Sequence, residues 1–299
     1  MKKIVYGLIL LLLAGGCASV SKQQRSVVND FAAKTENFAL YPDKIMGELA
    51  DIREIRGIYY ANSFTDPVLH LNELNNIASE RLKDDKLAGK TRIAFKILDE
   101  YAGALVQLSS DTPIKNAGES SLKFGVELET LVGMYNKADG AKPLPSGIGT
   151  MLAQAMDVGT RYYLANKQYK ELKKFVNQAD TLVSVVCGEM VEFLSSKGLG
   201  QLVQAEESGV NESFRFYFTK RSPTIEGEKE YIALMKRVEA VKQMQKQTIE
   251  AANSLKKAHK KLAAELNREF TFKEFAAVLN DFYKDVELLN KTAHLIGVK

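Results

Sequence analysis

Hydrophobic residues recur every three or four positions along most of the chain, the spacing of one face of an α-helix. In 67–88, for example, Leu71, Leu74 and Ala78 mark the face expected to be buried. We predict an all-α protein, an elongated and mostly antiparallel helical bundle of about six to eight helices, some of them long and coiled-coil-like. The predicted helices cover residues 20–40, 43–62, 67–88, 91–109, 113–138, 150–197, 224–268 and 272–296.

Proline and glycine positions divide the predicted helices. Pro67 follows Asp66, a good helix N-cap, and no proline interrupts a predicted helix. A segment rich in glycine and proline at 140–149 is the clearest linker. It separates a region of shorter helices from a region of longer ones, and we expect the two regions, 23–139 and 150–299, to form one continuous bundle.

Two segments leave alternatives open. Phe214, Phe216 and Phe218 alternate with other residues as in a strand, but a strand without a partner is unstable, so a helix or an extended loop is favoured. The stretch Gln245–Ala252 is a polar part of the predicted seam of the longest helix. It either fixes the register of the helices or forms a weak point in their packing.

The N-terminus has the pattern of an export signal. Lys2 and Lys3 precede an uncharged apolar run from Ile4 to Ala14, which fits a signal peptide and is too short to span a bilayer. The run leads into Leu13-Ala14-Gly15-Gly16-Cys17, and this segment resembles the lipobox of bacterial lipoproteins. An ordinary secretory signal and an uncleaved anchor are the alternatives.

The lipoprotein resemblance covers only the leader and implies how the chain is processed. Residues 1–16 would be removed, Cys17 would carry diacylglycerol and an acyl group, and 17–22 would form a short tether. Ala18-Ser19 follow the cysteine in place of the aspartate that retains such proteins at the inner membrane. The resemblance therefore implies a protein anchored in the outer membrane, facing the periplasm by default, with no cofactor other than its covalent lipid.

Composition excludes several classes of protein. The chain of 299 residues is 45% hydrophobic, too apolar for a disordered protein, and its two cysteines cannot form a disulfide scaffold. Loss of Lys2 and Lys3 lowers the formal net charge from +4 to +2, so binding to nucleic acid is not expected. Cys187 has apolar neighbours and is interpreted as an inert core thiol, with a reactive or dimer-forming thiol as the alternative.

Charge is unevenly distributed along the chain. Residues 29–85 carry eleven acids and six bases, whereas residues 229–268 carry ten bases and four acids. The densest basic cluster is Lys256, Lys257, Lys260 and Lys261, which we consider as a surface for anionic lipid or an acidic envelope partner. The plainer alternative is that these lysines pair with the acidic helices of the same bundle or face solvent.

Catalytic and metal-binding patterns are weak. His70 and Glu73 lie one helical turn apart but are interpreted as a solvated face, and His259 as a packing residue. Ser120 and Lys123 match the Ser-x-x-Lys pattern of penicillin-recognising enzymes without its companion motifs. The carboxylate pair Glu206-Glu207 lacks the surroundings expected of a catalytic pair. We therefore expect neither an enzyme nor a metal site.

Two functions fit these observations. The first is a non-enzymatic, lipid-anchored envelope protein that supports, spaces or recruits a partner. The alternative is a carrier or sensor that binds a lipid or another apolar ligand between helices. Its gap would be lined by Tyr162, Tyr163, Phe214, Phe216 and the glycines within 147–159.

Overall fold

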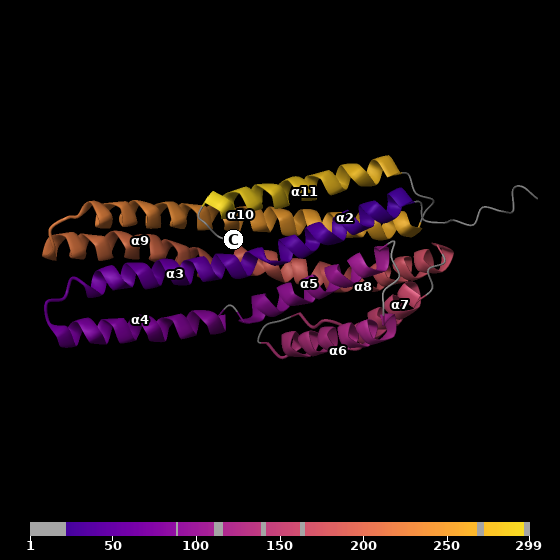
Figure 1. The fold of residues 1–299 in the computed structure, drawn as a ribbon, viewed down its shortest axis with the longest axis horizontal. Coiled ribbons are helices and arrows are strands. Elements are labelled where there is room, and N and C mark those ends of the chain that lie inside the picture. The colour runs from indigo at the N-terminus through magenta and orange to yellow at the C-terminus, as the bar shows by residue number, and fades with distance from the viewer. Residues whose placement is uncertain are drawn as a thin grey trace, which may run out of the picture.

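The computed structural model describes residues 22–87, 89–110, 116–138, 142–161, 165–267 and 272–295. In these ranges the secondary structure is entirely helical, which confirms the predicted all-α fold (Figure 1). The described helices are α2 (Lys22–Ala39), α3 (Tyr41–Ala61), α4 (Pro67–Leu87), α5 (Gly89–Ser109), α6 (Ala117–Asn136), α7 (Ile148–Arg161), α8 (Ala165–Leu194), α9 (Lys197–Lys220), α10 (Ile225–Asn267) and α11 (Phe272–Leu295).

Ten helices in the described ranges exceed the predicted six to eight, because the run at 150–197 is divided and α9 forms between the predicted ranges 150–197 and 224–268. Helix α7 ends at Arg161 and α8 begins at Ala165, so the apolar pattern continues across two helices. The following boundary has a clear local cause. Ser196 adopts an extended conformation and its hydroxyl accepts a hydrogen bond from the Leu199 amide, so it caps α9.

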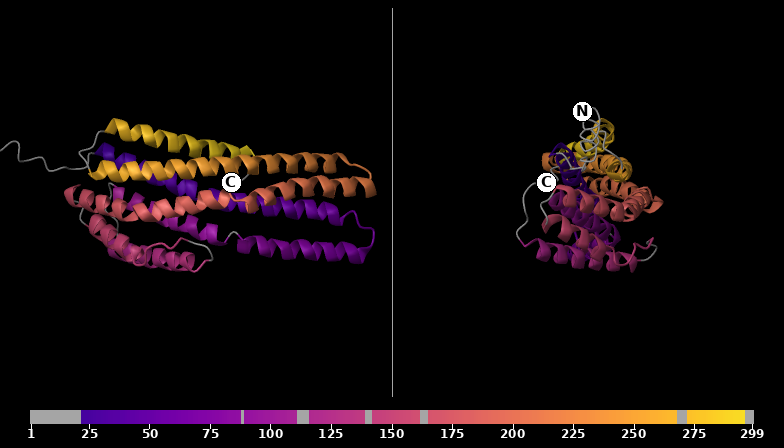
Figure 2. Two further views of the ribbon diagram at one scale, coloured as in Figure 1. Left: turned by 180° about the vertical axis from the view of Figure 1, so that it is seen from behind. Right: turned by 90° about the vertical axis from the view of Figure 1, so that its right-hand side faces the viewer.

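The helices run along one long axis and form an elongated bundle (Figures 1 and 2). Helix α10 has 43 residues, and at 1.5 Å per residue it extends about 65 Å. We call the end where α2 and α11 begin and α10 finishes the proximal end, and the end where α3 and α9 finish and α10 begins the distal end. None of the described helices combines the length and the hydropathy needed to cross a membrane.

A single hydrophobic core runs through the bundle. Every described helix except α4 contributes buried apolar side chains to it. Phe31 of α2 and Phe38 of the same helix both contact the ring of Phe282 on α11, at centroid distances of 6.0 and 6.1 Å. The apolar faces predicted from the sequence thus meet across helices far apart in the chain.

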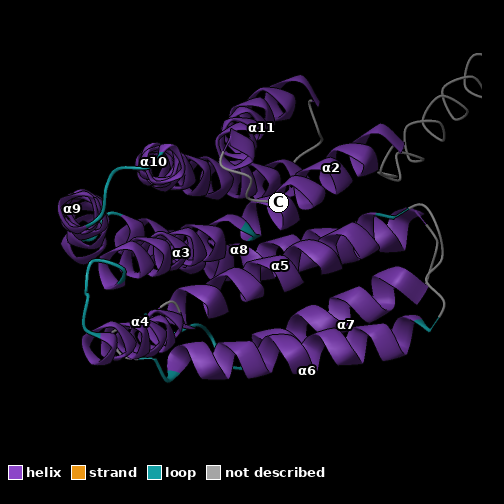
Figure 3. Cartoon of the chain, turned by 60° about the vertical axis from the view of Figure 1, so that its left-hand side comes forward, coloured by secondary structure: helices purple, strands orange, loops and turns teal. Residues whose placement is uncertain are grey.

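Helix α4 departs from its predicted packing. Leu71 is 59% exposed and Ala78 is exposed, while Leu74 is only half-buried. Helix α4 packs mainly against α3, where Ile77 fills the space left by the missing side chain of Gly57. Since α4 lies at the edge of the bundle with one main neighbour, the rest of its apolar face stays in solvent (Figure 3).

Helices α6 and α7 form a tightly packed hairpin. A Cβ added to Gly149 would lie 2.5 Å from the carbonyl oxygen of Gly125, so glycine permits the two backbones to touch. The carboxylate of Glu129 on α6 accepts hydrogen bonds from the amides of Gly147 and Gly149 at the start of α7. This carboxylate satisfies free N–H groups and opposes the positive end of the α7 dipole. Described residues 142–147 of the predicted linker connect these two helices.

The two ambiguous segments now have definite structures. Phe214 and Phe218 lie in α9, where Phe214 is buried and stacks on Tyr59 of α3 at 4.4 Å. Phe216 lies on another side of the helix and is 41% exposed. In the polar stretch of α10, the Gln245 amide donates to the carbonyl of Leu194, the last residue of α8. Gln245 therefore fixes the position of α8 against α10.

Candidate functional site

The predicted lipidation residue, Cys17, lies outside the described residues, as do Tyr162 and Tyr163 of the predicted ligand gap. Phe214, assigned to the same gap, is instead packed among aromatic rings in the core. Within the described ranges, no group of three or more histidine, cysteine, aspartate or glutamate residues is arranged to hold a metal ion.

The predicted lysine cluster lies on the proximal half of α10. Lys256, Lys257 and Lys260 are exposed, and Lys261 is half-buried with its Nζ 2.9 Å from a carboxylate oxygen of Glu265. The basic region, 229–268, contacts the acidic region, 29–85, at another place on α10. There Arg237 pairs with Glu48 of α3 and lies 3.8 Å from Asp51. The three exposed lysines lie towards the proximal end, where Lys256 and Lys260 are close enough to the Asp180 carboxylate of α8 to help lower its pKa.

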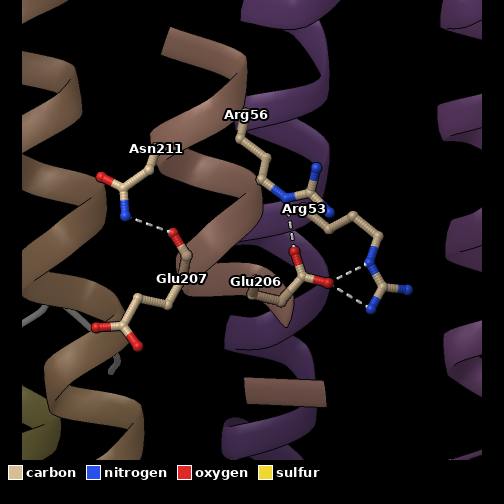
Figure 4. A network of polar contacts seen from close by, with 5 residues as sticks. All are labelled: Arg53, Arg56, Glu206, Glu207 and Asn211. Atoms are coloured by element: carbon tan, nitrogen blue, oxygen red, sulfur yellow. Dashed lines mark hydrogen bonds and ion pairs between the residues drawn. The ribbon is translucent and has the colours of Figure 1, made fainter. Parts of the chain in front are cut away.

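A polar network joins α3 to α9 in the distal half (Figure 4). The carboxylate of Glu206 is almost completely buried, and its two oxygens accept from Arg53 at 2.6 Å and Arg56 at 2.7 Å. Both arginines are about one-fifth exposed. The missing side chain of Gly209 leaves the space in which the Arg56 guanidinium lies.

The neighbouring residue Glu207 makes weaker, solvent-facing contacts. Its carboxylate pairs with Lys242 of α10 at 2.9 Å, and its carbonyl oxygen accepts from the side-chain amide of Asn211 (Figure 4). The oxygen of Asn211 in turn accepts from the Tyr231 hydroxyl. Adjacent glutamates therefore connect α9 to two different helices, and the arrangement orients α3, α9 and α10 rather than presenting a paired carboxylate to a substrate.

A second buried chain of hydrogen bonds joins α5, α8 and α10. The Tyr101 hydroxyl lies 2.8 Å from Nε2 of His259, and Nδ1 of His259 lies 3.2 Å from a carboxylate oxygen of Asp180. His259 and Tyr101 are buried, as expected for a packing histidine. Burial, with a smaller contribution from the Asp180 charge, raises the pKa of Tyr101 well above its ordinary value, so the hydroxyl keeps its proton.

The remaining candidate groups take structural positions. Cys187 is buried and unpaired, and burial raises the pKa of its thiol to about 12, which agrees with an inert core thiol. The Nδ1 atom of His70 lies 2.9 Å from the carbonyl oxygen of Ala61, so this histidine braces the α3–α4 turn. Lys123 of the Ser-x-x-Lys pattern is largely exposed and lies 3.8 Å from Glu127 on the same helix.

Helix α6 presents a second apolar stripe on its outer side. Leu122, Val126, Thr130 and Met134 are spaced four residues apart, and we call them the outer α6 stripe. Leu122 is 70% exposed, Val126 66% and Met134 51%. A groove of about 720 Å³ between α6 and α7 borders the stripe, with Gly118, Ser121, Gly125 and Ala153 among its lining residues.

Three arrangements could not be predicted from the sequence, because each depends on which helices pack together. They are the ion pairs of Glu206, the hydrogen-bond chain through His259, and the exposed outer α6 stripe. Nothing in the sequence separates the buried Glu206 from the half-exposed Glu207, because their difference arises from the helices packed against each of them. A usable signal was present on α6, where apolar residues occupy both the inner positions and the outer α6 stripe. Because α6 packs mainly against α5 and α7, its second apolar face stays exposed.

Comparison of the chain with protein-family models, with curated proteins and with solved structures found no match. The fold and the described sites define an elongated all-α bundle whose polar clusters connect its own helices.

Proposed function

We propose that this chain is a non-enzymatic, lipid-anchored protein of the bacterial cell envelope that spaces or recruits a partner. The observation that carries the proposal is the elongated bundle, which begins at the proximal end only a few residues after the predicted lipid acceptor Cys17. An acylated Cys17 would place the proximal end at a membrane surface. The distal end would then project into the periplasm by most of the length of α10, about 65 Å.

The position of exposed lysines on α10 supports an orientation with the proximal end at the membrane. The exposed lysines Lys256, Lys257 and Lys260 lie on the half of α10 that leads to the proximal end. A basic surface near a lipid anchor would favour anionic head groups or an acidic partner close to the membrane. The buried polar contacts of Glu206 and His259 connect helices of the bundle.

The test of anchoring compares Cys17→Ser with Ser19→Ala, a matched change two residues away. We expect wild-type protein and Ser19→Ala to fractionate with the outer membrane and to carry acyl chains by mass spectrometry of the N-terminal peptide. Cys17→Ser should lose the lipid and the outer-membrane association. Unmodified Cys17 in the mature wild-type protein would overturn the lipoprotein assignment.

The second candidate is a carrier of an apolar ligand, and the groove between α6 and α7 is the observation that favours it. Its volume of about 720 Å³ falls within the range of small-molecule sites. Mass spectrometry of gently purified protein, combined with melting in the presence of candidate lipids, tests this function. A ligand-free protein whose melting temperature ignores those lipids would contradict it.

A further inference from the structure

The outer α6 stripe has the shape of a helix-docking ridge. The inner side of α6 is already buried through Phe124, Leu128 and Val132, so the stripe is an additional apolar face with no partner among the described helices. Its residues repeat every four positions, which is the spacing of the ridges that interlock when two helices pack.

Depressions lie on both sides of this ridge. One is the groove between α6 and α7, whose lining includes the small residues Gly118, Gly125 and Ala153. The other lies along α6 and is lined by Glu119, Lys123 and Glu127 as well as by the ridge itself. A ridge between two grooves accepts the side chains of an incoming helix in the same way that neighbouring helices in a bundle interdigitate.

The charged residues beside the outer α6 stripe indicate which kind of partner could bind there. The groove between α6 and α7 is lined by two carboxylates, Glu129 and Asp157, and no basic residue lines it. On the other side of the ridge, Glu119 and Glu127 outnumber Lys123. The apolar ridge therefore has an acidic border, which favours a positively charged partner and disfavours a negatively charged one.

We propose that the outer α6 stripe binds an amphipathic helix of a partner protein, with lysine or arginine residues flanking the apolar face of that helix. This inference rests on the proposed recruiting function and names the surface and the partner chemistry. The partner's apolar side chains would enter the groove beside Gly125, and its basic residues would approach the exposed carboxylates of Glu119 and Glu127 at the border.

The experiment places a photoreactive benzoylphenylalanine at Val126 of the full chain in living cells. Matched controls carry it at Leu288 of α11, which is 48% exposed, and at Lys257 in the basic cluster. We expect an adduct from position 126 that is absent from position 288. Mass spectrometry should map the adduct to a protein segment with apolar residues at helical spacing and flanking lysine or arginine.

The other outcomes overturn the inference in distinguishable ways. An adduct only from position 257 would contradict the α6 site while preserving a recruiting function. A lipid adduct, an adduct to a second copy of the chain, or an adduct to an acidic segment at position 126 would contradict the proposed partner. Absence of protein adducts at all three positions would count against both the inference and recruitment.

A charge substitution then tests the ridge itself. With the photoreactive residue at Leu122, Val126→Lys should reduce the adduct on the order of tenfold, the change expected for loss of about 1.4 kcal/mol of binding free energy. Val68→Lys on α4, where Val68 is 63% exposed, is the control and should leave the yield unchanged. Circular dichroism and thermal melting verify that both variants fold, and an unchanged yield in folded Val126→Lys would contradict the site.

Discussion

The hydroxyl of Tyr101 lies 2.8 Å from Nε2 of His259, within the core where α5 faces α10. The carboxylate of Asp180 accepts from Nδ1 on the opposite side of the imidazole ring, so Nε2 is left as the acceptor for the tyrosine hydroxyl. The three side chains form one chain of hydrogen bonds from the surface of α8 to the centre of the bundle. A buried histidine is thereby satisfied at both ring nitrogens.

Tyr101→Phe is expected to lower the free energy of unfolding by about 1–3 kcal/mol, because it leaves Nε2 of His259 buried without a donor. Tyr283→Phe is the matched control, since the Tyr283 hydroxyl is buried without a hydrogen-bond partner among the described residues. That control removes a buried hydroxyl that has no partner, so it should leave the stability unchanged or raise it. Urea unfolding of both variants measures the difference, and equal effects would contradict a specific Tyr101–His259 contribution.

The contribution of Asp180 is expected to depend on pH. The hydrogen bond from His259, helped by the charges of Lys260 and Lys256 and opposed by partial burial, holds the Asp180 pKa below its ordinary value of 3.8. A lowered pKa means that the folded state favours the ionised carboxylate. The stabilisation is present above pH 3.8 and is lost as the pH falls through the lower folded-state pKa.

Asp180→Asn should therefore be less stable than the wild type at pH 7, and the difference should shrink below pH 3.8. Denaturant unfolding over a series of pH values measures it. A difference that stays constant as the solution is acidified would show that the charge of Asp180 is not the source of its contribution.

The adjacent residues Glu206 and Glu207 offer a direct comparison of buried and exposed ion pairs. Glu206→Gln should destabilise the protein by about 2–4 kcal/mol, because Arg53 and Arg56 lose the carboxylate that compensates their partly buried charges. Glu207→Gln should cost at most about 1 kcal/mol, since its pair with Lys242 is about one-third exposed. Similar unfolding free energies for the two variants would contradict this distinction.

Cys187 is expected to resist alkylation in the folded protein. Burial and a pKa of about 12 leave almost no accessible thiolate at pH 8, so iodoacetamide should modify Cys187 only after denaturation. Ser195→Cys provides an exposed thiol just after the same helix and should react at once. Rapid native labelling of Cys187 would show that α8 opens readily.

The helical periodicity was enough to predict the fold class and most helix positions. It failed at 150–197 because α7 and α8 share a continuous apolar pattern, and a pattern of local spacing does not register a change of direction between helices. It also failed for α4, where Leu71 has the spacing of a core residue but no helix lies over it. Both errors arise from the number and position of neighbouring helices.

The candidate sites divide in a similar way. Cys187 and His259 could be recognised as core residues from their own apolar or seam positions, since local sequence sets which side of a helix they occupy. Their partners could not be recognised, because Tyr101, His259 and Asp180 lie on three helices distant in the chain.

The sequence by itself determined that the chain forms amphipathic helices and carries a lipobox-like leader, because both are properties of short consecutive segments. Only the tertiary structure decided that Glu206 is buried between two arginines, whereas Glu207 faces solvent, and that Leu122 and Val126 stay exposed. Burial depends on which helices pack together. The spacing of apolar residues indicates that a helix has an apolar face. The packing of the helices in the bundle determines which of these faces are buried.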